Sequence, residues 1–255
     1  NGSPSQTVIP TASKSYIVAG SVFIKNSVGR SIDTALLDGT FPAKLGDSTQ
    51  PQVLIIHTHG SEAYTMPAGE EYTPSGSYRT ADTEKNMIRV GDEIAAVLSQ
   101  YGISVLHDRQ IHDSDYNSAY GKSRSSAAAY LEKYPSLSFV LDIHRDAISD
   151  AEGRQYKVVS KEDPRAAQLS IVMGSNYGAW MDNLRLAAAV QANLLKEHPT
   201  LMRPIILRSY GYNQGLCNGS LLVEVGAAGN SLDEAIYSAR LFAVGFAETL
   251  GAEKS

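Results

Sequence analysis

The chain of 255 residues has a single cysteine, Cys217. One thiol cannot form a disulfide within the chain, and it cannot supply the several thiolates of a cysteine-rich zinc site. A metal ion bound by this chain would therefore need histidine and carboxylate ligands.

Long apolar runs and an excess of positive charge are lacking as well. Because no run of about 18 apolar residues is present, we expect no membrane span in this sequence. No charged-then-apolar signal region opens the chain, and its first five residues are typical of a cut linker. The formal net charge of -5 argues against nucleic acid or an anionic membrane surface as a partner.

The remaining composition, 43% hydrophobic and 19% charged, is that of an ordinary globular protein. Short apolar segments of strand type alternate with segments of helical periodicity, which is the pattern of an α/β fold. We predict one twisted, mostly parallel sheet of about six strands with helices on both faces. Strands are expected near residues 53–56, 103–106, 138–143, 158–159, 169–173, 205–207 and 219–226, and helices near 81–101, 120–133, 183–198 and 231–250.

The first 48 residues have a weaker pattern. Residues 15–24 have β-type composition, turn residues follow at 26–29, and residues 32–37 favour a short helix. We therefore predict a linker and a small N-terminal β appendage over residues 1–48, and the main domain over residues 49–255.

The segment 53–64 has an abrupt change of polarity. Four aliphatic residues predict a buried strand, and His57, His59 and Glu62 follow it within six positions. In open α/β sheets ligands bind beyond the carboxyl ends of the strands, so these imidazoles could reach a metal or a substrate. Two solvated surface histidines are the alternative, and the spacing alone does not decide between them.

The same design recurs at His144, which directly follows the apolar segment 139–143. Glu84 is expected in the first turn of a helix, and Glu224 lies within an aliphatic strand. Two histidines and one carboxylate are a complete catalytic zinc set that leaves a position for water. A second carboxylate could then move the proton of that water.

Other roles are open for these acidic residues. Glu84 could stabilise only its helix N-terminus, an effect of roughly 0.3 to 1 kcal/mol. A purely structural Glu224 would need a partner such as Arg145 or Arg208, because an unpaired buried carboxylate is costly. Glu62 could replace Glu84 as a ligand, and His57 could support the ligands without touching the metal. The three other histidines are expected to be solvated; they are His107, His112 and His198.

Four blocks of the sequence resemble the zinc-dependent N-acetylmuramoyl-L-alanine amidases, a family of cell-wall hydrolases. The blocks are residues 53–64, 83–106, 139–147 and 221–230. The wording His-Thr-His-Gly-Ser-Glu-Ala-Tyr at 57–64 and Asp-Ile-His-Arg-Asp-Ala at 142–147 resembles one branch, the stage II sporulation protein P family of endospore-forming bacteria. The resemblance covers about residues 50 to 250.

By position within the blocks, the resemblance implies His59, Glu84 and His144 as zinc ligands and Glu224 as the catalytic carboxylate. Two departures matter. The wider family has Asp-Pro-Gly-His-Gly-Gly where this chain has Ile-His-Thr-His-Gly-Ser, so His57 competes with His59, and we choose His59 because it precedes the glycine. The family's Glu-Val-Gly-Phe becomes Glu-Val-Gly-Ala at 224–227, which predicts a smaller pocket wall.

The resemblance also implies an activity: hydrolysis of the amide that joins the lactyl group of N-acetylmuramic acid to L-alanine in peptidoglycan. For the sporulation branch it implies endopeptidase activity on stem-peptide cross-links and work at the septum during engulfment. An extracytoplasmic location, a membrane anchor preceding this sequence and a glycan-cleaving partner similar to stage II sporulation protein D are further implications. The alternatives are a zinc peptidase acting on stem peptides only and a catalytically silent peptidoglycan-binding scaffold.

Overall fold

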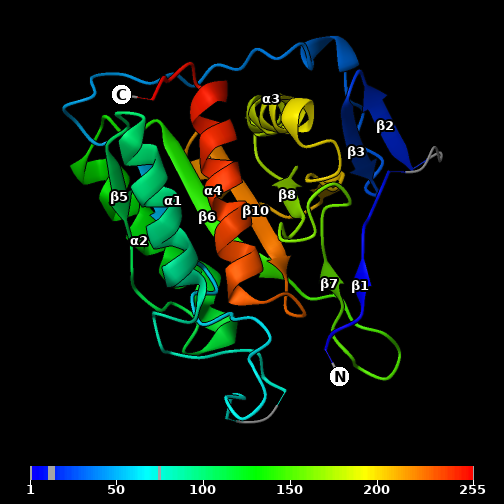
Figure 1. Cartoon of the computed structure of the whole chain (residues 1–255). Helices are drawn as coiled ribbons and strands as arrows, with labels where there is room; N and C mark the ends of the chain where they lie inside the picture. Colours follow the sequence, from blue (N-terminus) through cyan, green and yellow to red (C-terminus); the bar gives the residue numbers. More distant parts are fainter. Residues whose placement is uncertain (1, 11–14, 74–75, 255) are drawn as a thin grey trace.

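The computed structural model describes residues 2–10, 15–73 and 76–254, and it has one main sheet with helices on both faces (Figure 1). The strand order is β2-β3-β9-β8-β10-β6-β4-β5, and neighbouring strands are parallel except in the pairs β2–β3 and β8–β10. The predicted α/β fold with a mostly parallel sheet is confirmed. The sheet has eight strands, more than the six or so expected.

The elements have the following bounds. The strands are β1 (Ser5–Gln6), β2 (Tyr16–Ala19), β3 (Val22–Asn26), β4 (Val53–Ile56), β5 (Val105–His107), β6 (Phe139–Asp146), β7 (Lys157–Val158), β8 (Leu169–Gly174), β9 (Ile205–Arg208) and β10 (Ser220–Ala227). The helices are α1 (Met87–Gln100), α2 (Ala119–Lys133), α3 (Trp180–Glu197) and α4 (Leu232–Thr249), with short 3-10 turns at Thr34–Leu36, Tyr116–Ser118 and Gln214–Leu216.

Strand β4 is buried on both faces, because its side chains alternate between two hydrophobic clusters. Val53 and Ile55 join the large cluster beneath α1, α3 and α4, while Leu54 and Ile56 pack with Ala127 of α2. Figure 1 shows α1, α4 and α3 side by side on one face of the sheet. The strand is thereby fixed from both sides, and its carboxyl end is held in place.

The N-terminal segment is continuous with this sheet. Strands β2 and β3 form a hairpin whose turn is at residues 20–21 and not at the expected 26–29, and β3 pairs in parallel with β9, with Ile24 opposite Ile205. Val22 and Ile24 are buried in the main core. Residues 16–26 therefore extend the sheet and do not form an appendage separate from it, and the division at residue 48 stays a prediction.

Helix α1 begins later than its sequence indicates. We expected Asp82 or Thr83 at the cap, but Asn86 is the N-cap, and its side chain accepts a hydrogen bond from the amide of Ile88 at 2.9 Å. The residues before it pair with the loop after β4: Ala63 forms a bridge with Asn86. Glu84 therefore lies in a turn outside the helix.

Three parallel strands, β4, β6 and β10, end at the same edge of the sheet. Strand β6 continues to Asp146, so His144 lies within the strand and not in the loop after it. Across the neighbouring pair, His144 is in register with Glu224 of β10. Within the described residues, no helix combines the length and apolar character needed to cross a membrane.

Candidate metal centre

Three side chains converge at this edge of the sheet: His59, Glu62 and His144. Nδ1 of His59 lies 3.5 Å from one carboxylate oxygen of Glu62, and Nδ1 of His144 lies 3.6 Å from the other. All three residues are buried, and their candidate ligand atoms lie within 4.8 Å of one another. Within the described ranges, this is the set of three histidine, cysteine or acidic residues that could bind a metal ion.

The local chain explains how the three meet. His59 and Glu62 lie in the tight turn after β4, where the amide of Glu62 donates to the carbonyl of His59 at 3.1 Å. Glu62 is fixed from outside by Arg79, whose guanidinium lies 3.4 Å from it, and by the amide of Arg145 at 3.3 Å. The turn after β4 and the neighbouring strand β6 thus bring the candidate ligand atoms of His59, Glu62 and His144 close together.

The spacing of these atoms fits a tetrahedral ion. Zinc–nitrogen and zinc–oxygen bonds of about 2.1 Å imply ligand–ligand separations of about 3.4 Å. Each histidine nitrogen lies 3.5 or 3.6 Å from a different carboxylate oxygen of Glu62, close to that edge length, and the three ligand atoms lie within 4.8 Å of one another. Two imidazoles and one carboxylate are also the donor set that catalytic zinc prefers.

Asp142 fixes the orientation of His144, a role that sequence reasoning missed. Its Oδ1 lies 2.9 Å from Nε2 of His144 and accepts from the amide of Thr58 at 2.9 Å, while its Oδ2 accepts from the Thr58 hydroxyl at 2.6 Å. A carboxylate behind a histidine is the usual support of a metal ligand. The sequence contained an indication of this contact, since Asp142 and His144 are two residues apart on a strand and their side chains therefore point to the same face.

Burial opposes charge on His144, but the carboxylates of Asp142 and Glu62 outweigh it and raise the pKa of His144 well above 6.5. Burial likewise acts to raise the pKa of Glu62. The close contacts with the two histidines, the charge of His144 and the charge of Arg145 outweigh it and hold that pKa well below its usual range. Glu62 is therefore ionised, as a metal ligand must be.

Glu224 lies beside His144, and one of its two carboxylate oxygens lacks a hydrogen-bond partner among the described residues. Its Oε2 is buried and makes no hydrogen bond within the described residues. Burial, opposed by the charge of His144, raises the pKa of Glu224 to about 8. Arg145 does not pair with it, because its side chain donates to the carbonyls of Ala63 and Tyr78. A buried oxygen without a hydrogen-bond partner next to the cluster is consistent with a carboxylate that binds water, metal or substrate.

The structure does not bring Glu84 to the histidines. Glu84 is exposed in the turn before α1, where its amide donates to the carboxylate of Asp82 at 3.0 Å. Its expected place depended on a helix starting near residue 83, and the helix starts at Met87. Glu62, expected only as a substitute, lies at the cluster.

His57 is not part of the three-residue cluster. Its Nδ1 lies 2.9 Å from the carbonyl of Ile143, and its Nε2 lies 2.8 Å from Nε2 of His107. Burial, together with the nearby His107, lowers the pKa of His57 to about 3, so this ring is neutral. It supports the strand that bears His144. The expectation that His107 and His112 are solvated is wrong: both are largely buried, and His112 contacts Asp108 at 2.9 Å.

Aromatic rings surround His59. Tyr116 stacks on it with ring centres 4.7 Å apart, and Tyr120 meets it edge-on at 5.6 Å. Tyr116 lies in the 3-10 turn just before α2, and Tyr120 lies in the first turn of α2. Sequence reasoning did not single them out, because they lie more than 50 residues from His59.

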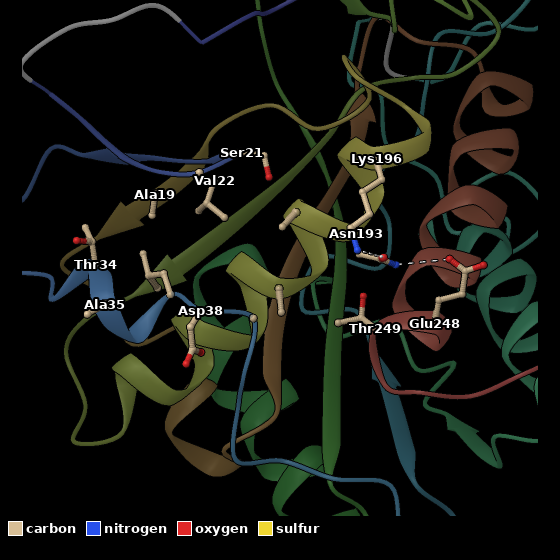
Figure 2. A pocket seen from close by; sticks show the side chains of 15 residues that line it. Ala19, Ser21, Val22, Thr34, Ala35, Asp38, Asn193, Lys196, Glu248 and Thr249 are labelled. Atoms are coloured by element: carbon tan, nitrogen blue, oxygen red, sulfur yellow. Dashed lines mark hydrogen bonds between the residues drawn. The ribbon is translucent and has the colours of Figure 1, made fainter.

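A separate hollow of about 790 Å³ lies at the other end of the molecule, near the carboxyl end of α4 (Figure 2). It is lined in part by Asp38, Asn193, Lys196 and Glu248. Asn193 contacts both Lys196 and Glu248 at 3.5 Å, so these polar groups are partnered among themselves. None of the residues at the metal centre lines this hollow.

The chain was then compared with known proteins. The family model described as stage II sporulation protein P (SpoIIP) matches residues 19–247. The chain belongs to this family. A curated SpoIIP relative, stage II sporulation protein P of Bacillus subtilis (strain 168), is 25% identical over 225 residues. The match covers 81% of this chain and 53% of that protein, so the chain spans about half the length of the relative.

Solved structures show the fold that this SpoIIP chain shares. The CwlD amidase from Clostridioides difficile, solved in complex with the GerS lipoprotein, superposes with a TM-score of 0.52 at 13% identity, covering 78% of this chain and 98% of that one. The N-acetylmuramoyl-L-alanine amidase AmiC2 of Nostoc punctiforme gives 0.46 at 14% identity, with coverages of 78% and 94%. At these identities the likeness is one of fold alone.

Proposed function

We propose that this SpoIIP chain is a zinc-dependent peptidoglycan hydrolase that cleaves the amide between N-acetylmuramic acid and L-alanine during sporulation. One observation supports it most: a buried His59–Glu62–His144 cluster has an unpartnered carboxylate, Glu224, one strand away. Family membership supports the sporulation setting, and the fold neighbour CwlD is an amidase, which supports the hydrolysis of an amide.

In this proposal His59, Glu62 and His144 bind the zinc ion, with Asp142 fixing the orientation of His144. When bound, zinc polarises the substrate carbonyl and makes a water molecule more acidic. Glu224 takes a proton from the attacking water and gives it to the departing alanine nitrogen. A pKa raised to about 8 makes the ionised carboxylate a stronger base toward that water, and the proton it gains is the one that it then gives to the nitrogen.

Product analysis tests the reaction. Purified peptidoglycan is digested with metal-free, zinc-loaded and Glu224→Gln protein, and the fragments are identified by mass spectrometry. The zinc-loaded chain should release intact stem peptides and glycan strands, and Glu224→Gln should bind zinc without turnover. Cut cross-links with the lactyl–alanine amide intact would instead establish the peptidase, and cut cross-links beside free stems the additional endopeptidase. No product in any sample would establish the silent scaffold.

The wider setting is part of the proposal. We propose action at the sporulation septum, anchorage through a segment outside this sequence, and cooperation with a glycan-cleaving protein similar to stage II sporulation protein D. The fold neighbour from Clostridioides difficile was solved with a protein partner, which supports such cooperation in general terms. Co-purification of the full-length protein with and without the glycan-cleaving protein tests it.

A further inference from the structure

Exposed aromatic rings gather beside the metal centre. Tyr116 and Tyr210 have exposed fractions of 60% and 66%, the highest of the large hydrophobic side chains in the described ranges. Tyr116 lies just before α2, and Tyr210 lies in the loop between β9 and β10. Exposed aromatic side chains that cluster near a candidate site indicate a binding surface.

These rings form one connected row. Tyr116 and Tyr120 both contact the ring of His59, as described above. Tyr120 is followed by Tyr212, with ring centres 6.0 Å apart, and Tyr212 by Tyr210 at 5.8 Å. We call these four residues, Tyr116, Tyr120, Tyr212 and Tyr210, the tyrosine ledge. Its ring contacts lead from the candidate zinc ligand His59 to the exposed Tyr210.

The outer part of the ledge is held in a strained backbone. Tyr212 and Asn213 have φ angles of 48° and 59°, in the left-handed region where a bulky residue is a genuine outlier. The conformation is fixed from α2, because the side-chain amide of Asn213 donates to the Tyr120 carbonyl at 3.0 Å and to Ser123 at 3.1 Å. Strain of this kind, costing about 1–3 kcal/mol for each such residue, is concentrated at functional sites.

The catalytic carboxylate lies close to the same ledge. Burial raises the pKa of Tyr212, the charge of Arg208 opposes this rise, and Tyr210 and Glu224 add to it. Burial and the charges of Asp142, Glu224 and Glu62 act on Tyr120 in the same way. Tyr120 contacts the rings of both His59 and Tyr212, so the inner tyrosines lie next to the candidate ligand, while Tyr210 is exposed to solvent.

The chemistry of the ledge selects one part of the proposed substrate. Tyrosine rings have flat apolar faces with hydroxyl groups at their edges, which suits the apolar faces and hydroxyl edges of sugar rings. Tyr210 is the most exposed ring of the ledge, whereas Tyr116 is already stacked on His59 and contacted by Arg79. A stem peptide carries carboxylates and would favour cations. The guanidinium of Arg79 lies over the Tyr116 ring at 5.2 Å, but it is paired with Glu62 and Asp113. Lys122 and Lys133 line a hollow of about 990 Å³ along α2 that has no acidic side chain in its lining.

We propose that the tyrosine ledge binds the sugar rings of the glycan strand next to the scissile amide. The identity of the ligand rests on the proposed function, whereas the binding surface itself is read from the structure. The ledge orients the substrate: the strand lies along the tyrosines, and the lactyl–alanine amide reaches the zinc ligands from that side.

Binding to peptide-free glycan strands tests the ledge without catalysis. Fluorescently labelled strands of several disaccharides are titrated with the whole chain, and with Tyr210→Ala, Tyr210→Phe and Tyr212→Ala. Loss of one aromatic contact should weaken binding about three- to tenfold, and Tyr210→Phe should bind nearly as wild type. Tyr16→Ala, on the edge strand β2, is the matched control and should have no effect.

Turnover gives a second readout. Tyr210→Ala should raise KM for long strands and leave kcat unchanged, and it should cleave a single-disaccharide muropeptide as wild type does. Unchanged strand binding by both alanine variants would overturn the proposal, and so would a loss of affinity for free stem peptides in place of strands. A chain that binds strands through the tyrosines yet cleaves nothing would leave the ledge standing and refute the proposed function.

Discussion

Glu62 and Glu224 both lie beside His144, yet their surroundings favour opposite charge states. Glu62 has two histidines and the charge of Arg145 around it, so its pKa falls in spite of burial. Glu224 has the burial without a hydrogen-bond partner, and its pKa rises to about 8. Two carboxyl groups whose pKa values are driven apart are the usual arrangement of a ligand or charged group next to a proton carrier.

The first prediction separates the two candidate ligand carboxylates. Glu62→Gln should lower zinc affinity by at least about 10- to 100-fold, because it removes the charged oxygen between His59 and His144. Glu84→Gln should bind zinc as wild type does, since that carboxylate is exposed and outside the cluster. Competition with a chromogenic chelator measures both. Loss of zinc from Glu84→Gln with retention by Glu62→Gln would restore the assignment that the family resemblance implies.

The second prediction concerns pH and stability in the metal-free protein. Between its ordinary pKa of 4.5 and about 8, folded Glu224 keeps a proton that the unfolded chain has released. The free energy of unfolding therefore falls as pH rises through this window, by at most about 1.4 kcal/mol per pH unit. Glu224→Gln cannot lose that proton, so its stability should exceed that of wild type increasingly toward pH 8.

Urea unfolding at a series of pH values, with a chelator present, measures the difference. Glu84→Gln changes an exposed carboxylate and serves as the control, because its unfolding should follow wild type at every pH. Parallel stability curves for wild type and Glu224→Gln would show that Glu224 is not held in its protonated form.

At the residue scale, sequence placed His59, His144 and Glu224 at strand ends, and the structure brings them together. The roles of these residues remain proposals. Sequence could not choose between Glu62 and Glu84, because the choice depends on where α1 begins. That start is set by distant contacts: the amide of Met87 donates to the carbonyl of Glu62 at 3.0 Å.

At the scale of elements, helix periodicity was readable and helix boundaries were not. Side chains suited to capping occur before α1 at Asp82, Thr83 and Asn86. The side chains of Asp82 and Asn86 each accept a hydrogen bond from the backbone amide two residues later in the chain. Each of these side chains can cap a helix in the same way, so the local sequence does not indicate which of them begins α1. The bridge between Ala63 and Asn86 selects the later one, because it holds Asn86 against the loop after β4 while residues 83–85 form a turn.

The third prediction concerns the approach of α1 to the histidine pair beneath the site. A Cβ added at Gly91 would lie 2.5 Å from Nε2 of His57 and 2.6 Å from Nε2 of His107. Both rings are largely buried and cannot easily move aside. Gly91→Ala should therefore destabilise the fold by about 1–3 kcal/mol, which exceeds the gain of up to about 1 kcal/mol from helix propensity.

Gly121 in α2 is the matched control, because a Cβ there would meet nothing within 4 Å. Gly121→Ala should stabilise by about 0.5–1 kcal/mol. Chemical denaturation of both variants gives the comparison. If both substitutions stabilise the protein, α1 does not approach the histidine pair as closely as the structure shows.

At the scale of the whole molecule, the alternation of strands and helices was enough to predict a mostly parallel sheet. It did not reveal that the sheet continues through β9 into β3 and β2. Pairing between residue 24 and residue 205 leaves no trace in local periodicity, and the weak composition of the N-terminal segment suggested an appendage. Strand order is a property of distant contacts that one sequence does not display.

The last prediction tests whether the N-terminal segment is an integral part of the fold. A chain of residues 49–255 lacks Val22, Ile24, Leu37 and Phe41, which are buried in the main core. At about 1.5–3 kcal/mol for each buried side chain, their loss is comparable to the whole stability of a typical domain. It also exposes β9 as an unpaired edge, which favours aggregation. Thermal unfolding and size-exclusion chromatography should show a chain that melts at a much lower temperature and self-associates.

Removal of residues 1–10 alone takes away only the two-residue pairing of β1 with β7 and the contacts near it, so its effect should be much smaller. Equal melting of the 49–255 chain and the full chain would mean that the segment is a separate appendage after all, as its composition first suggested.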